Sequence, residues 1–117
     1  MQSNLKAPIS AQDERIAKLI VNAAFTIHKA LGAGLLERVY ETCLCHDLEK
    51  NKRQAIVPLV YDGIKFLEGF RIDVLVKERI ICELTSVEKI ENVHLAQTLT
   101  YLKLTGNRLG FLINFNV

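Results

Sequence analysis

Cysteine is scarce in this chain of 117 residues, which has only Cys43, Cys45 and Cys82. Cys43 and Cys45 lie two positions apart on an expected helix, so their side chains point to different faces. No Cys-x-x-Cys pair occurs, which argues against a structural zinc site. An odd number of cysteines without a signal peptide is typical of a reducing compartment, so we expect a cytoplasmic protein.

The chain also lacks a strong excess of positive or negative charge, because 15 basic and 13 acidic residues leave a net charge of +2. That excess is too small to indicate a nucleic-acid partner by itself. No apolar run approaches the length of a membrane span, and the first residues lack the apolar segment of a secretory signal. The sequence also has no low-complexity segment or internal repeat. Half of its residues are hydrophobic, enough for the core of one domain without disulfides.

Hydrophobic periodicity predicts three helices. The first begins after Ser10, a candidate N-cap, and ends at Gly32. The second covers about residues 35–50, and we expect Glu37 to be half buried at the edge of its apolar arc, near the positive helix N-terminus. The third covers about residues 92–104. The residues expected on its buried face are Leu95, Ala96, Leu99 and Leu102.

Strand patterns occur around and after an Asp62-Gly63 hairpin turn. The expected strands cover residues 56–61, 64–67, 70–76, 80–85 and 109–115. The last helix bridges two strands over more than a dozen residues, which suits a right-handed parallel crossover. We therefore expect an α/β fold with element order α-α-β-β-β-β-α-β, a mixed sheet and helices that cover it.

The hairpin formed by residues 70–85 brings two acids together. If Val76 opposes Ile80 across a three-residue loop, Asp73 falls opposite Glu83 and Arg71 falls opposite Thr85. Directly opposed residues share a face of the sheet. One face would then carry Arg71, Asp73, Glu83 and Thr85, while Phe70, Ile72, Val74 and Val76 share the other face of their strand.

Two opposed carboxylates repel each other, and near an apolar core one of them tends to remain protonated. A bound divalent cation removes this conflict, and hard oxygen ligands favour Mg²⁺ or Mn²⁺ over zinc. The alternative is a structural pair of carboxylates kept apart by Arg71 or by water, because ion-pair networks produce similar clusters.

A second set of polar residues lies on the third helix. His94, Gln97 and Tyr101 are spaced by three and four positions, so they form one stripe along the helix. Such a stripe is ordinarily a solvated flank. If it faced the acids, it could instead contact a phosphate or position a water.

Several short motifs that contain these residues follow one another along the chain. Residues 34–40 read Gly-Leu-Leu-Glu-Arg-Val-Tyr, and further motifs lie at residues 69–73, 83–85, 87–89, 94–106 and 112–116. In this order and spacing, which covers about residues 16–117, the chain resembles the GxxExxY family of small bacterial proteins. That family is grouped with the PD-(D/E)XK nuclease superfamily, whose core has the order α-β-β-β-α-β.

The resemblance implies a restriction-endonuclease-like core with an extra N-terminal helix. Residues 10–117 would form a single nuclease-like domain behind a flexible segment, residues 1–9. It also implies a metal site made by Glu37, Asp73 and Glu83 that holds Mg²⁺ or Mn²⁺. Gln97 and Tyr101 match the family's motif on the following helix, so they and His94 would bind substrate.

The chain departs from the superfamily pattern at Thr85, where that pattern has a lysine two residues after the second strand acid. Threonine can hold a water, but it has no positive charge. Loss of such an electrostatic group often costs about 10²–10³ in rate. Arg71, expected opposite Thr85, and Lys89, just beyond the strand, are the candidates to supply the charge.

Three functions fit these residues. The first is a metal-dependent nuclease that hydrolyses DNA or RNA at Glu37, Asp73 and Glu83, with Asp73, Glu83, Thr85 and either Arg71 or Lys89 in catalysis. The second is a degenerate nuclease-like domain that binds nucleic acid or a protein partner without cleaving. The third is a structural domain whose acids serve folding only. None of them involves a membrane, and relatives of this size often form homodimers.

Overall fold

The computed structural model describes residues 9–66 and 70–116. Most of the segment expected to be flexible, together with Leu67 of an expected strand and Gly69 of the motifs, lies outside the described residues. The elements in chain order are α1 (Ala11–Leu31), α2 (Glu37–Asp47), β1 (Asn51–Ile56), β2 (Val60–Tyr61), β3 (Ile64–Lys65), β4 (Arg71–Val76), β5 (Ile80–Thr85), α3 (Asn92–Thr105) and β6 (Leu109–Asn114). Within the described ranges, no helix has both the length and the apolar character needed to cross a bilayer.

Four strands form one mixed sheet in the order β1-β4-β5-β6, and β2 pairs with β3 in a separate hairpin. β1, β4 and β5 are antiparallel neighbours, whereas β6 runs parallel to β5 and is connected to it through α3. Without α1 and the hairpin, the order is α2-β1-β4-β5-α3-β6. The expected α-β-β-β-α-β core, its mixed sheet and the extra N-terminal helix are confirmed.

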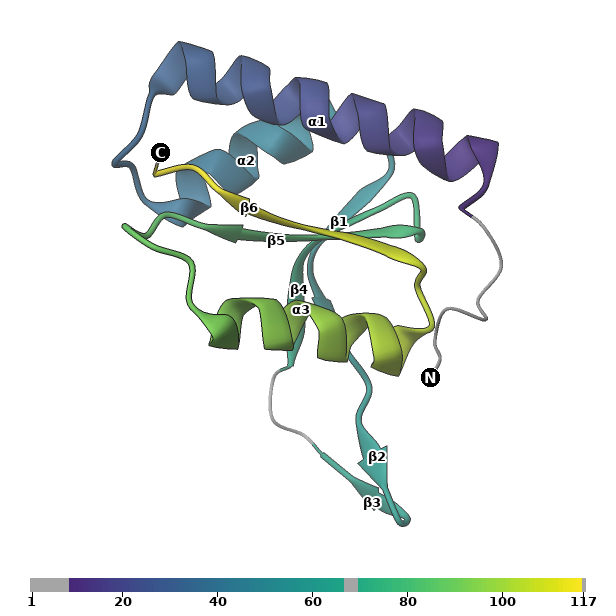
Figure 1. The fold of residues 1–117 in the computed structure, drawn as a ribbon. Coiled ribbons are helices and arrows are strands. Elements are labelled where there is room, and N and C mark those ends of the chain that lie inside the picture. The colour runs from purple at the N-terminus through teal and green to yellow at the C-terminus, as the bar shows by residue number, and fades with distance from the viewer. Residues whose placement is uncertain (1–8, 67–69, 117) are drawn as a thin grey trace.

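The helices cover both faces of the sheet (Figure 1), with α1 and α2 on one face and α3 on the other. The larger core lies under α1 and α2 and includes Ile20, Leu44, Val74, Val76 and Cys82. A smaller cluster under α3 contains Val57, Ile72, Ile81 and Tyr101. The β2–β3 hairpin projects away from these layers, and all four of its strand residues are exposed.

Tyr40 connects the loop between α1 and α2 to the core. Its ring is fully buried and stacks on Phe115, with ring centroids 4.3 Å apart. Its hydroxyl donates to the carbonyl of Gly32 at 2.7 Å and accepts from the N–H of Leu35 at 3.1 Å. The loop also needs Gly34, whose φ of +91° lies in the region that favours glycine. These contacts fix the start of α2 against the sheet.

The predicted helix boundaries and buried faces are partly wrong. α2 begins at Glu37 and ends at Asp47, so it is shorter than the expected 35–50. On α3, Leu95 and Leu99 are 51% and 56% exposed, and Ala96 is exposed as well. The buried residues of this helix are Thr98 and Tyr101. The sheet beneath α3 carries Glu83 and Thr85, so the helix turns a polar flank toward it.

The first strand lies earlier than the sequence predicts. The expected strand at 56–61 contains only the last residue of β1 and the two residues of β2. β1 shows no apolar alternation because it is an edge strand whose residues are exposed or half buried. Its pairing with β4, from Asn51↔Val76 to Ile56↔Arg71, holds it in place. Charged Lys52 and Arg53 are typical of a protected sheet edge.

The side-chain alternation of β4 shifts at Asp73. Val74 and Val76 pack under α1 and α2, but Ile72 and Phe70 pack on the α3 side, so the prediction that all four share a face is wrong. In β1, Gln54 lies across from Asp73 with a left-handed φ of 51°. The β1–β4 pairs include Arg53↔Val74 and Ala55↔Ile72 on either side of this position. Such an irregularity re-aims a side chain, as β-bulges do beside active sites.

We expect Tyr40→Phe to lower the free energy of unfolding by about 1–3 kcal/mol, because it leaves the Gly32 carbonyl and the Leu35 N–H without their partner. Urea denaturation followed by circular dichroism measures this change. Tyr61→Phe is the control, since Tyr61 is 70% exposed on the hairpin. Equal stability of the two variants would contradict the role given to the Tyr40 hydroxyl.

Candidate active site

Asp73 and Glu83 lie where β4 and β5 separate. The predicted register is confirmed, because the two strands pair through Val76↔Ile80, Leu75↔Ile81 and Val74↔Cys82. At the next two opposed residues, Asp73 and Glu83, side-chain hydrogen bonds take the place of the backbone hydrogen bonds between the strands. The N–H of Asp73 donates to Oε2 of Glu83 at 2.8 Å, and the N–H of Leu84 donates to Oδ2 of Asp73 at 2.8 Å. Each acid thus binds the backbone of the opposite strand.

Burial raises the pKa of both carboxyl groups. The Glu83 side chain is buried, and burial raises its pKa to about 7, against the lowering effect of the Asp73 N–H. The negative charges of Asp73 and Glu41 raise it further. The pKa of Asp73 is also raised, again mainly by burial, although the N–H of Leu84 and the amide of Gln54 oppose the change. Glu83 is therefore partly protonated near neutral pH in the metal-free protein.

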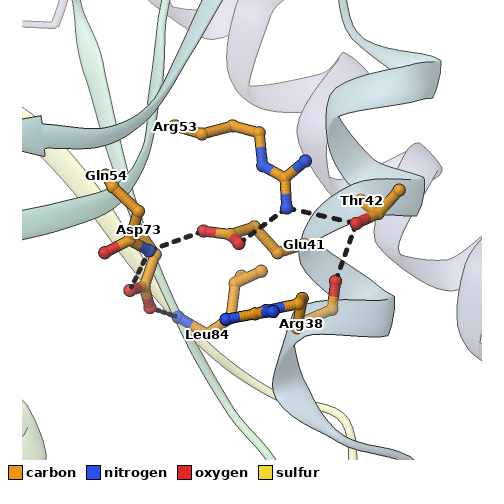
Figure 2. A network of polar contacts seen from close by, with 7 residues as sticks. All are labelled: Arg38, Glu41, Thr42, Arg53, Gln54, Asp73 and Leu84. Atoms are coloured by element: carbon orange, nitrogen blue, oxygen red, sulfur yellow. Dashed lines mark hydrogen bonds and ion pairs between the residues drawn. The ribbon is translucent and has the colours of Figure 1, made fainter.

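Another acid, Glu41, is buried and lies close to Asp73 (Figure 2). Its carboxylate accepts from Arg53 at 2.9 Å and from the Gln54 amide at 2.8 Å. The same amide nitrogen lies 3.4 Å from Oδ1 of Asp73. Arg53 also donates to the hydroxyl of Thr42 at 3.1 Å. The network joins α2 to β1 and β4 directly beside Asp73.

Sequence reasoning missed Glu41, Arg53 and Gln54. Glu41 follows Glu37 by four positions, so the helical repeat already places both acids on one side of α2. That spacing was the available signal for Glu41. Gln54 had no comparable signal, because its contacts depend on its left-handed backbone and on the pairing of β1.

Glu37 is exposed, so the expectation that it is half buried is wrong. It is the first residue of α2, where the chain leaves the Tyr40-bound loop and the helix still faces solvent. Glu37 nevertheless lines the same pocket as Asp73 and Glu83. Within the described part of the chain, no three His, Cys, Asp or Glu side chains lie close enough together to hold a metal ion.

This pocket, called the α3-side pocket below, has a volume of about 270 Å³. Besides the three acids it brings together four other residues singled out in the sequence: Arg71, Thr85, His94 and Gln97. Thr85 is only 7% exposed, and its hydroxyl has no hydrogen-bond partner among the described residues. His94 accepts the N–H of Glu91 on Nδ1, in the capping box of α3.

Tyr101 and Lys89 do not line the α3-side pocket. Tyr101 is buried in the smaller core cluster, and its hydroxyl accepts from the Gln97 amide at 2.9 Å. It therefore holds Gln97 in position. Lys89 is exposed in the connection between β5 and α3. Arg71 is not directly paired with Thr85, because the pairing of β4 with β5 ends at Val74↔Cys82.

The model of the PD-(D/E)XK nuclease superfamily matches residues 14–117. The chain therefore belongs to this superfamily. No curated protein and no solved structure matches the chain. The narrower likeness to the GxxExxY family, the homodimer and the cytoplasmic location stay predictions.

Nucleases of this superfamily generally use divalent metal ions, and the residues present fit such an ion. Asp73 and Glu83 each bind a backbone N–H through one oxygen. Oε1 of Glu83 accepts no hydrogen bond among the described residues, and Oδ1 of Asp73 receives only the long contact from Gln54. Mg²⁺ commonly uses one or two protein carboxylates and completes its shell with water. Oε1 of Glu83 and the weakly bonded Oδ1 of Asp73 meet that requirement, because both acids line a polar pocket.

We expect Glu83→Gln to stabilise the metal-free protein at neutral pH. Glu83 has its ordinary pKa of 4.5 in the unfolded chain and about 7 in the folded protein, so the folded state binds its proton more tightly. The stabilisation from this proton is complete below pH 4.5 and is lost as the pH rises through 7. The full effect corresponds to about 3 kcal/mol.

Urea denaturation in EDTA at several values between pH 5 and 8 tests this. Wild type should lose stability across the range relative to Glu83→Gln, which keeps an oxygen to accept the Asp73 N–H. Parallel pH profiles of the two proteins would show that Glu83 titrates normally.

Proposed function

We propose that this protein is a metal-dependent nuclease that hydrolyses a phosphodiester bond of DNA or RNA at Glu37, Asp73 and Glu83. The observation that carries the proposal is the pair of half-buried Asp73 and buried Glu83, which have raised pKa values and line a polar pocket. An acid pair that served folding alone would have no need of a pocket lined with Arg71, His94 and Gln97. Membership of a nuclease superfamily supports the same reaction.

In this proposal Asp73 and Glu83 hold a Mg²⁺ or Mn²⁺ ion, and Glu37, on the wall of the same pocket, acts on the ion through a bound water. When bound, the ion polarises the phosphoryl group and lowers the pKa of a water. Arg71 compensates negative charge that develops on the phosphate. His94 and Gln97 contact the substrate, and Tyr101 fixes the amide of Gln97. Lys89 remains the second candidate for the missing lysine; it is exposed and follows Val87, a residue of the pocket wall, by two positions.

Thr85 receives a specific role in the proposal. Its hydroxyl is buried, unpartnered and on the wall of the α3-side pocket. A buried hydroxyl without a partner costs about 1–3 kcal/mol, which a water in the pocket relieves. We assign to Thr85 the positioning of the attacking water beside Glu83.

The acid pair is tested with Asp73→Asn and Glu83→Gln. Both should reduce cleavage of labelled single- and double-stranded DNA and RNA in Mn²⁺ by at least about 10²-fold, because each removes a charged ligand. Gel analysis of the products measures the rate. Asp47→Asn is the matched control, since Asp47 is an exposed acid at the end of α2. Cleavage that survives both site substitutions would rule out this mechanism.

Thr85→Val should lower the cleavage rate at least about tenfold without loss of stability. The substitution keeps the shape of the side chain and removes only the unpartnered hydroxyl, so unfolding should be unchanged or occur at higher urea. Thr98→Val is the control, because Thr98 is equally buried but bonded to the carbonyl of His94. That variant should lose some stability and retain activity. A Thr85→Val protein with full activity would remove Thr85 from the site.

A further inference from the structure

A second pocket, called the α2-side pocket below, adjoins the acids. It has a volume of about 640 Å³. Its lining shares Glu37, Asp73 and Leu84 with the α3-side pocket. The two pockets therefore meet at the acids, one extending under α2 and β1 and the other toward α3.

The α2-side pocket has cationic residues on its wall. Arg38, in the first turn of α2, is exposed, and its side chain makes no ion pair or hydrogen bond among the described residues. Arg53 is 41% exposed and already pairs with Glu41. Leu36 at the N-cap provides no side-chain acceptor for the first N–H groups of the helix. An anion at this position would thus find one free guanidinium and the positive end of a helix.

A nucleic-acid strand that is cleaved at Asp73 and Glu83 must extend away from these acids on both sides of the cleaved bond. The acids repel the phosphates on either side, so those phosphates need cations close by. Arg71 provides one in the α3-side pocket. On the other side Arg38 is the free cation among the described residues that line the α2-side pocket.

We propose that the α2-side pocket binds the nucleotide next to the cleaved bond, with Arg38 on its phosphate, and that the substrate is single-stranded or unpaired at this nucleotide. The pocket reaches down to Glu41, which is 8% exposed, and to half-buried Asp73. A base stacked and paired in a duplex cannot enter such a recess, whereas an unpaired base can. Thr42 and Gln54 offer polar contacts for it. This inference rests on the nuclease proposal, because cleavage at Asp73 and Glu83 is what places the strand across both pockets.

The test measures binding separately from cleavage. Full-length protein in EDTA is titrated against a fluorescein-labelled single-stranded 12-mer and against the same sequence as a duplex, with anisotropy recorded over a series of salt concentrations. Arg38→Ala should weaken single-strand binding about five- to tenfold and reduce the salt slope by about 0.7, the value for one phosphate contact. Arg38→Lys should retain most of the slope. Arg15→Ala, an exposed arginine on α1 outside both pockets, is the matched control.

Three results would overturn the inference: equal behaviour of Arg38→Ala and Arg15→Ala, wild-type binding to the duplex as tight as to the single strand, or no binding of either oligonucleotide. The nuclease proposal is judged by cleavage in Mn²⁺ instead. If wild type cleaves while Arg38→Ala binds normally, only the subsite is wrong. If binding depends on Arg38 and nothing is cleaved, the subsite stands without the nuclease.

Discussion

The exchange of hydrogen bonds between two carboxylates and two strands organises this protein. Asp73 accepts the N–H of Leu84, and Glu83 accepts the N–H of Asp73, where a regular ladder would have joined the backbones. The strands can part at this point because the lost backbone bonds are replaced by side-chain ones. Their separation opens both pockets. The same contacts hold the acids in fixed orientations, a precondition for binding an ion in a defined geometry.

Where β4 and β5 separate, positive side chains only partly balance the negative charge of the acids. The charge of Glu41 raises the pKa of Asp73 and of Glu83, and Arg53 is the cation paired with this group in the described part of the chain. Burial and this excess raise the pKa of Glu83 to about 7, so Glu83 keeps part of its proton near neutral pH. A divalent ion would displace that proton, so metal binding and proton release are coupled here. The Glu41–Arg53–Gln54 network keeps Glu41 directed at β1.

Much of the fold could be predicted from the sequence, because strong local patterns agree with the tertiary structure. β5 has the expected bounds, and α3 and β4 differ from expectation by one residue at one end. The register of the β4–β5 hairpin followed from its loop length, and it brought Asp73 and Glu83 together correctly. β1 was missed because a polar edge strand lacks apolar alternation and depends on its neighbour for stability. The face of α3 was misjudged because its leucines are exposed, and the shift at Asp73 arises from a backbone angle at Gln54 that no residue pattern marks.

The β2–β3 hairpin has a consequence for how this chain can change in evolution. It makes no sheet bonds with β1, β4, β5 or β6, and Val60, Tyr61 and Ile64 lie more than half exposed. A two-stranded hairpin of this kind adds little to the stability of the domain. Its residues are therefore free to diverge, to lengthen or to be exchanged for another loop while the nuclease core stays intact. The hairpin is the segment where new specificity can be acquired without risk to folding.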